Sequence, residues 1–277
     1  MSQPQRALIA VTGSTGRLGG RIASALAAHG VQQRLLLRSP EKAPDLGAEV
    51  VRSSYDEPAG LEGVDTLLMV SAAEHPDRVG QHLTLLDAAA EAGVRRVVYT
   101  SFLSAAPDAT FTLARDHWHT EEHLRELGLA YVVTRNSMYA DMFPLFRGED
   151  GVIRGPAGAG RVAPVALDDV ADALVAALLD PELAGTFTLT GPELLSLAEV
   201  AAQLTAQGLP TRFVDETLEE AYASRATYGA PAYEVDGWVS TYLAIKDGSL
   251  AVVTADVRLL TGHDPRALSG LVGSRRA

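Results

Sequence analysis

Residues 7–29 read ALIAVTGSTGRLGGRIASALAAH, and this stretch decides the fold. An apolar run over residues 7–11 leads into the spacing Gly13-x-x-Gly16-x-x-Gly19, and an amphipathic helical pattern follows at once. A strand, a tight glycine turn and a helix in this order are typical of the first unit of a dinucleotide-binding α/β fold. An ordinary βα turn with surplus glycine is the alternative, but the flanking strand and helix favour nucleotide binding.

Each glycine of the spacing has a physical reason. Gly13 lets the chain turn sharply off the strand, Gly16 lets the backbone approach a pyrophosphate without a Cβ in the way, and Gly19 lets the helix pack close to the strand. The free N–H groups and the positive dipole end of the new helix then face the phosphates. The turn therefore predicts a diphosphate site.

Composition limits the class of protein. The chain has 277 residues, 47% hydrophobic and 21% charged, which suits one large α/β domain or a nucleotide domain with a small second lobe. Its net charge is −12 and it contains no cysteine. Nucleic acid and anionic membranes are therefore poor partners, thiolate metal sites and disulfides are excluded, and redox chemistry needs a bound cofactor.

No targeting pattern is visible in the sequence. The first residues, MSQPQR, lack the apolar segment of a signal peptide, and no apolar run approaches the roughly 18 residues of a membrane span. The expected compartment is the cytoplasm.

The end of the second strand predicts the choice of cofactor. Residues 33–37 form an apolar strand that is followed by Arg38, with no Asp or Glu there. An acidic residue at this place binds the ribose 2′-hydroxyl of NAD, whereas an arginine accommodates the 2′-phosphate of NADP. Arg38 therefore favours NADPH over NADH, although a solvated arginine remains the alternative. Arg17 can reach the same phosphate or face solvent.

Strands and helices alternate as far as residue 135. Strands are expected at 48–52, 65–71, 95–101 and 129–135, and helices at 79–92 and 113–124. This rhythm predicts a Rossmann-type, doubly wound parallel sheet of the α/β class. Ser71 and Ala72, at the end of the fourth strand, are expected to border the adenosine and phosphates.

The rhythm changes after Tyr139. We expect short strands at 152–154, 162–165 and 185–190, a helix at 167–179, and another helix that begins at the capping box of Ser196 and Glu199. Residues 250–254 form either a strand or an irregular entry to the next helix. The predicted division is a Rossmann domain over 1–147 and a small substrate-side α/β lobe over 148–277, with segments of about 162–190 completing the Rossmann domain.

Two familiar kinds of site are not supported. On the histidine-rich helix, the pairs His119 with His123 and His117 with Glu121 have the spacing of metal ligands, but no HExxH pattern and no third ligand accompany them, so no metal is predicted. A catalytic tyrosine four residues before a lysine occurs only at Tyr242 and Lys246, far along the chain. We interpret this pair as a coincidence on a surface helix.

Several longer stretches resemble the NmrA-like group of atypical short-chain dehydrogenases/reductases, and within it the quinone oxidoreductases and triphenylmethane reductases. The stretches are VTGSTGRLGG (11–20), LLRSPEKA (36–43), YTSFLSA (99–105), DHWHTEEHLRELGLAYVVTRNSMYADMF (116–143) and DVRLLTGHDPRAL (256–268). Together they span nearly the whole chain. The resemblance implies a Rossmann domain, a small C-terminal lobe and NADPH bound in a cleft between them.

The resemblance also assigns roles to residues. The implied cofactor-binding set is Gly13, Ser14, Thr15, Gly16, Arg17, Leu18, Arg38, Ser71, Ala72, Ser101, Phe102, His117 and Asn136. Among these, His117 falls where many relatives place a lysine against the nicotinamide ribose. Asn136 and Tyr139 border the nicotinamide and substrate pocket. Ser54 departs from the pattern, because relatives often have an aspartate near the adenine there.

The expected activity is hydride transfer from NADPH, or also NADH, to a small planar conjugated acceptor such as a quinone, without a tyrosine–lysine pair. Such acceptors are electrophilic enough that positioning carries most of the catalysis, and the product anion can take its proton from water. His117 and Tyr139 are the candidate catalytic residues, and His117 orients the ribose, relays a proton or serves only as structure. The sequence is compatible with a homo-oligomer.

Two other functions share the glycine turn. One is a regulator that binds NADP(H) and senses its redox state without turnover, and the other, weaker one is a sugar-nucleotide epimerase. The absent tyrosine acid disfavours the epimerase, and the match around Asn136 and Tyr139 favours an enzyme over the regulator.

Overall fold

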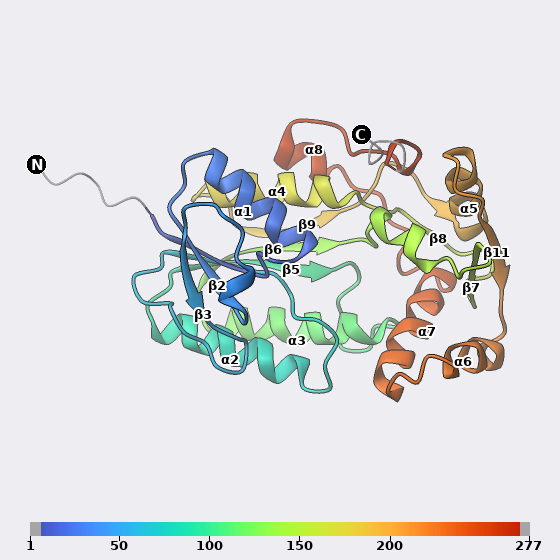
Figure 1. Ribbon diagram of the computed structural model, residues 1–277, viewed down its shortest axis with the longest axis horizontal. Coiled ribbons are helices and arrows are strands. Elements are labelled where there is room, and N and C mark those ends of the chain that lie inside the picture. The colour runs from blue at the N-terminus through green and yellow to red at the C-terminus, as the bar shows by residue number, and fades with distance from the viewer. Residues whose placement is uncertain (1–6, 272–277) are drawn as a thin grey trace, which may run out of the picture. The chain divides into compact units, whose positions relative to one another are not determined.

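The computed structural model describes residues 7–271 (Figure 1). Its strands are β1 Ile9–Thr12, β2 Gln33–Leu37, β3 Glu49–Arg52, β4 Thr66–Met69, β5 Arg96–Phe102, β6 Ala130–Asn136, β7 Val152–Gly155, β8 Arg161–Val162, β9 Gly185–Leu189, β10 Leu195–Ser196 and β11 Arg212–Asp215. Its α-helices are α1 Arg17–Ala28, α2 Arg78–Glu91, α3 Thr112–Glu126, α4 Leu167–Leu179, α5 Leu197–Ala206, α6 Leu218–Ala226, α7 Ala232–Lys246 and α8 Asp256–Thr261. Short 3₁₀ helices occupy Pro40–Lys42, Ala140–Phe146 and Leu268–Gly270. Among the described residues, no helix combines the length and apolar character needed to cross a bilayer.

The main sheet has seven strands in the order β3-β2-β1-β4-β5-β6-β9. β1 pairs in parallel with both β2 and β4, β2 with β3, and β4 with β5. Figure 1 shows α1 and α4 on one face of this sheet and α2 and α3 on the other. The strand order reverses between β1 and β4, and such a switch point is where open α/β sheets bind ligands. The predicted doubly wound α/β fold is confirmed.

The turn between β1 and α1 depends on three glycines. Gly13 has a φ of +66°, which is the left-handed region that glycine adopts at little cost. The Gly16 N–H donates to the Gly13 carbonyl at 2.8 Å and closes the turn. A Cβ on Gly19 would lie 2.6 Å from the Gly13 carbonyl carbon and closer still to its oxygen, so only glycine permits this approach of helix to strand.

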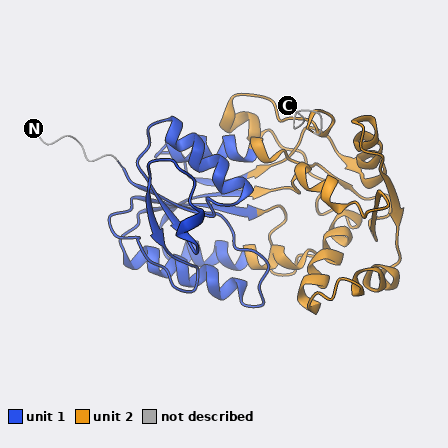
Figure 2. Ribbon diagram, in the orientation of Figure 1, with its two compact units in different colours: residues 1–101, 118–134, 170–187 blue, residues 102–117, 135–169, 188–277 orange. Residues whose placement is uncertain are grey.

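The chain forms two compact units, coloured separately in Figure 2. Unit 1 comprises residues 1–101, 118–134 and 170–187, and unit 2 comprises 102–117, 135–169 and 188–277. The predicted division into 1–147 and 148–277 stays a prediction, and the two units interleave along the chain instead of following one another.

One hydrophobic core of unit 1 lies between the sheet and the helices α2 and α3. Strand residues of alternating register, such as Leu67, Met69 and Val97, pack against Leu86 of α2 and Leu124 of α3. All of these side chains are buried, and burying a large aliphatic side chain stabilises a fold by about 1.5–3 kcal/mol. This packing fixes the strand ends from which the functional side chains emerge.

Unit 2 has its own small sheets and its own core. β7 pairs in parallel with β11, and β8 pairs antiparallel with β10. A buried arginine connects α6 to β7, to the residue after β11 and to α7. Arg225 of α6 pairs with Glu216 at 3.0 Å, donates to the Arg154 carbonyl at 2.8 Å and lies 5.1 Å from the centre of the Tyr242 ring. The Arg225 charge is thus compensated inside the unit, as a buried charge requires.

Two local expectations need correction. The strand expected at 162–165 is only the two-residue β8, which covers Arg161–Val162. Of the two alternatives for residues 250–254, the irregular one is observed, and the Thr254 N–H donates to Thr190 Oγ1 at 3.0 Å. Tyr242 and Lys246 do share α7, but Tyr242 is buried in the unit 2 core, so this helix is not simply a surface helix. The capping box of Ser196 and Glu199 is confirmed.

Replacing Gly19 with alanine should destabilise the protein by about 1–3 kcal/mol, because the new methyl group overpacks the turn carbonyl. Gly237→Ala is the matched control, since Gly237 also lies within a helix but an added Cβ there meets only Leu113 and Thr112 at 3.9 Å. The control should be neutral or more stable by up to about 1 kcal/mol through helix propensity. Urea unfolding measures both, and equal stability of the two variants would contradict the packing argument.

Candidate functional site

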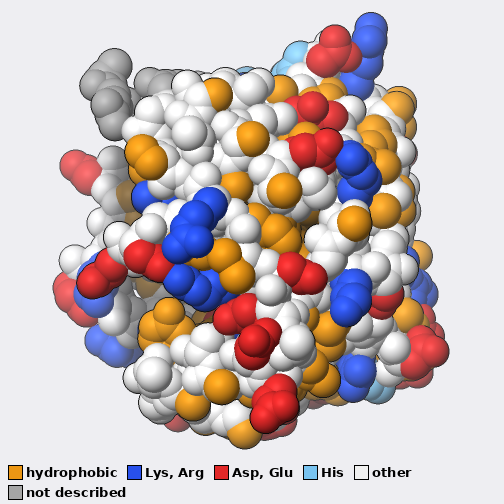
Figure 3. All heavy atoms as spheres, turned by 90° about the vertical axis from the view of Figure 1, so that its right-hand side faces the viewer, with side chains coloured by type: hydrophobic (Ala, Val, Ile, Leu, Met, Phe, Trp, Pro, Cys, Tyr) orange, Lys and Arg blue, Asp and Glu red, His pale blue; other side chains and the backbone are white. Residues whose placement is uncertain are grey.

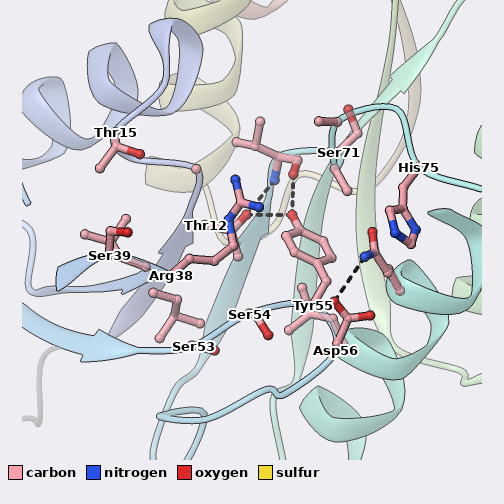
Figure 4. A pocket seen from close by; sticks show the side chains of 18 of the residues that line it. Thr12, Thr15, Arg38, Ser39, Ser53, Ser54, Tyr55, Asp56, Ser71 and His75 are labelled. Atoms are coloured by element: carbon pink, nitrogen blue, oxygen red, sulfur yellow. Dashed lines mark hydrogen bonds between the residues drawn. The ribbon is translucent and has the colours of Figure 1, made fainter. Parts of the chain in front are cut away.

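A cavity of about 320 Å³ in unit 1 opens at the carboxyl ends of β1, β2 and β4 (Figure 4). Its walls come from the glycine turn, from the segments at the ends of β2, β3 and β4, and from α2. Its lining residues are Thr12, Gly13, Thr15, residues 36–39, Lys42, residues 53–56, residues 70–75, Gln81 and Leu85. The cavity therefore lies at the switch point of the sheet, where the fold predicts a ligand.

A hydrogen-bond network connects the glycine turn to the opposite wall. Thr12 Oγ1 accepts the Val70 N–H at 2.9 Å and lies 3.0 Å from the hydroxyl of Tyr55, which donates to the Val70 carbonyl. Figure 4 shows these contacts as dashed lines. Burial raises the pKa of the Tyr55 phenol to about 12, so it remains protonated and keeps donating. The network holds the ends of β1 and β4 together under the cavity.

The first turn of α1 has the properties of an anion site. The cap residue Gly16 provides no side-chain acceptor for the first N–H groups, and the first turn contains no acidic residue. Ser14 is 2% exposed, and within residues 7–271 its hydroxyl has no hydrogen-bond partner. Backbone donors at the positive end of a helix bind phosphate groups well. The turn thus fits a diphosphate.

The opposite corner of the cavity is basic. Arg38 follows β2 and is exposed, and Ser39 and Lys42 line the cavity beside it. Arg52 Nη1 donates to the Arg38 carbonyl at 3.0 Å, which fixes the backbone that carries the Arg38 side chain. Ser54 also lines the cavity, but its hydroxyl accepts the Glu57 N–H at 2.9 Å within its own loop. The corner fits a phosphate on a ribose better than an uncharged ribose hydroxyl.

Five of the residues proposed for cofactor binding line this cavity together: Gly13, Thr15, Arg38, Ser71 and Ala72. Ser101 does not line this cavity. It is 3% exposed, and its hydroxyl donates to Glu121 Oε1 at 2.6 Å. Sequence reasoning missed Lys42, Tyr55 and Asp56 in the lining. The only sequence feature that indicated these residues was their position shortly after β2 and β3.

Four further proposed residues lie in unit 2. Asn136 Nδ2 donates to the Tyr139 hydroxyl at 3.3 Å, so these two residues are brought together. Asn136 is 1% exposed, and its Oδ1 has no partner within the part of the chain that the structure describes. Burial raises the pKa of Tyr139 to about 12. His117 is also buried, and its ring stacks on Phe102 with 6.4 Å between centroids.

One member of each pair considered as metal ligands, His123 and Glu121, contacts another side chain. His123 Nε2 lies 2.6 Å from Asp87 Oδ1. Glu121 accepts from Ser101 and also pairs with Arg125 at 2.9 Å. The His123 imidazole and the Glu121 carboxylate therefore already have partners within the protein.

Fold and cavity together define a dinucleotide-binding α/β protein of the doubly wound class. The chain belongs to the NmrA-like family, whose model matches residues 5–222.

Similar proteins include enzymes that act with reduced nicotinamide cofactors. A NAD(P)H azoreductase of Xenophilus azovorans is 30% identical over 274 residues, which cover 95% of this chain and 96% of the relative. The structure of the NADPH-dependent quinone oxidoreductase of Escherichia coli, solved with NADPH, has a TM-score of 0.86, 29% identity, and coverage of 96% of this chain and 99% of that chain. Triphenylmethane reductase of Citrobacter sp., solved with NADP(H), has a TM-score of 0.83 and 27% identity, with coverage of 97% and 100%.

Replacing Arg38 with alanine should weaken NADPH binding by roughly 10- to 100-fold and leave NADH binding nearly unchanged, because a charge-assisted contact to a 2′-phosphate contributes about 1.5–3 kcal/mol. Calorimetric titration of both cofactors measures the difference. Arg95→Ala is the control, since Arg95 forms an exposed pair with Asp65 and does not line the cavity. Equal losses for NADPH and NADH would remove Arg38 from the phosphate role.

Proposed function

We propose that this protein is an NADPH-dependent reductase that transfers hydride to a quinone or a similar planar conjugated acceptor. The observation that carries the proposal is the cavity at the switch point, with Gly13 and Thr15 of the glycine turn at one end and the basic corner of Arg38, Ser39 and Lys42 at the other. A dinucleotide with a 2′-phosphate has anionic groups at these same two places. The named activities of the similar enzymes support the same reaction class.

The residues of unit 1 would hold the cofactor by its anionic groups. The N–H groups of residues 14–18 would bind the diphosphate, and Arg38 would bind the 2′-phosphate. Ser71 and Ala72 would form the wall beside the adenosine and phosphates. Bound NADPH supplies a hydride from its nicotinamide ring, and the chain itself offers no cysteine for redox chemistry.

Asn136, Tyr139 and His117 would border the nicotinamide and the acceptor. The buried Oδ1 of Asn136 is an acceptor that suits an amide N–H of a ligand, because a buried polar atom without a partner is costly. Tyr139 stays protonated and accepts from Asn136, so its ring offers an apolar edge and its hydroxyl a neutral donor. His117 would orient the ribose, with its ring beside that of Phe102 at 6.4 Å between centroids.

The proposed acceptor needs little acid catalysis from the protein. A conjugated acceptor such as a quinone becomes an anion when it takes the hydride, and that anion is basic enough to take a proton from water. The main task of the site is therefore to hold the cofactor and the acceptor in contact and in the reactive orientation. Tyr242 and Lys246 take no part in this proposal, because Tyr242 is buried among the residues of the unit 2 core.

The protein surface suits a small substrate more than a polyanion. On the face drawn in Figure 3, acidic and basic side chains lie interspersed, with hydrophobic ones scattered among them. The net charge of −12 opposes binding to nucleic acid or to anionic lipid.

The direct test mixes the purified protein with NADPH and a panel of quinones, azo dyes and triphenylmethane dyes, and follows the absorbance of the reduced nicotinamide. Oxidation of NADPH that depends on one of these acceptors is the expected result. Tight NADPH binding without oxidation by any member of the panel would instead favour the redox-sensing regulator. The Arg38→Ala variant is the internal control, because its rate should recover at high NADPH concentration.

Replacing Tyr139 with phenylalanine should raise the KM for the acceptor severalfold and change kcat by less than about threefold. A residue that acts as general acid would instead contribute 10²–10⁴-fold to kcat. Because burial raises the pKa of Tyr139 to about 12, its phenol stays almost fully protonated up to pH 10. The wild-type kcat should therefore show no ionisation of this phenol between pH 6 and 10. A hundredfold loss of kcat would contradict water as the proton source.

A further inference from the structure

Two side chains of α2 hold one peptide group in the wall of the cavity. Arg78 Nε donates to the Ala72 carbonyl at 2.9 Å, and the Ala72 N–H donates to His82 Nε2 at 2.9 Å. Ala72 lines the cavity, whereas Arg78 and His82 lie behind it and are 4% and 0% exposed. Both polar atoms of this wall residue are thus fixed from inside unit 1.

The histidine must be in one tautomer to do this. Since Nε2 accepts the hydrogen bond from the Ala72 N–H, the hydrogen of the neutral ring lies on Nδ1. This nitrogen is 2.8 Å from Thr120 Oγ1 of α3. The rings of Tyr55 and Tyr99 pack against the imidazole with centroids at 5.7 and 5.8 Å. Burial and the neighbouring Arg78 charge lower the pKa of His82 well below its usual value, which keeps the ring neutral.

The same helix also reaches the facing wall. Gln81 Nε2 donates to Asp56 Oδ2 at 3.0 Å, and both residues line the cavity. In Figure 4, Tyr55 and Asp56 lie below Ser71 and to the left of His75, and one of the dashed lines starts at Asp56. The start of α2 therefore fixes the spacing between two walls that come from different parts of the sequence.

We propose that His82 is a positioning residue of the dinucleotide cavity, which acts through the Ala72 peptide and in its Nδ1–H tautomer. Its side chain is 0% exposed and does not line the cavity. Its effect on binding comes from holding the segment of residues 71–73 in the one backbone position that fits the ligand. This inference rests on the cofactor-binding part of the proposed function.

Loss of the imidazole acceptor has a defined consequence. Without it, the Ala72 N–H lacks its partner, and the wall segment is free to rotate that N–H toward another acceptor. Binding then has to restore the original backbone position, which weakens affinity by roughly tenfold, the usual effect of one hydrogen bond. A glutamine at the same place can offer its amide oxygen to Ala72, so it should restore most of the affinity.

The experiment compares three variants of the full chain by calorimetric titration with NADPH at pH 8, together with the melting temperature of each. His82→Leu should raise the Kd about tenfold, and His82→Gln should stay within about threefold of the wild type. The matched control is His123→Leu, because His123 also connects α3 to α2, through Asp87, but does not contact the cavity wall. That control should bind NADPH as the wild type does.

A role that is only structural would give a different pattern. Equal affinities for His82→Leu and wild type, or an equal loss of affinity in His123→Leu, would overturn the proposal. If wild type itself does not bind NADPH, the proposed function fails instead.

A second measurement covers the case in which His82→Leu does not fold. Nitrogen-15 NMR of histidine-labelled wild-type protein at pH 8 should find the His82 hydrogen on Nδ1, and Thr120→Val should shift the tautomer equilibrium and raise the NADPH Kd. A hydrogen on Nε2 in the wild type, or unchanged affinity and tautomer in Thr120→Val, would contradict the proposal.

Discussion

The close approach of α1 to the end of β1 is the constraint on which the rest of the structure depends. Gly19 lies so near the Gly13 carbonyl that no side chain fits between them, and the left-handed conformation of Gly13 turns the chain into the helix. The first N–H groups of α1 have no side-chain cap, and Gly13 and Thr15 of the preceding turn line the cavity. A phosphate site at this point follows from the backbone alone, and the other walls then determine which nucleotide fits.

The walls come from distant parts of the chain, and buried polar contacts join them. Thr12, Tyr55 and Val70 form one such connection, and Ala72, His82 and Thr120 form another. In a low-dielectric interior these bonds are strong, and an unpaired partner is costly, so the network specifies one arrangement of the strand ends. Arg38, in contrast, is exposed and can adapt its side chain to the ligand.

The sequence predicted the fold well because its signals are local. Hydrophobic periodicity predicted the alternating strands and helices, and the glycine spacing predicted the turn with its diphosphate site. The contacts of Tyr55, Gln81 and His82 were not predicted, since they join residues far apart in the chain and leave no pattern in either segment. For the same reason the sequence did not predict that the Ser101 hydroxyl donates to Glu121 of α3. Residues 250–254 were ambiguous because side-chain bonds, not a ladder, determine their path.

A crystal structure of the protein with NADPH tests the central claim most directly. The account predicts diphosphate oxygens within hydrogen-bond distance of the backbone N–H groups at the start of α1, and the 2′-phosphate beside Arg38. A diphosphate bound away from the glycine turn, with the first N–H groups of α1 left to solvent, would contradict it.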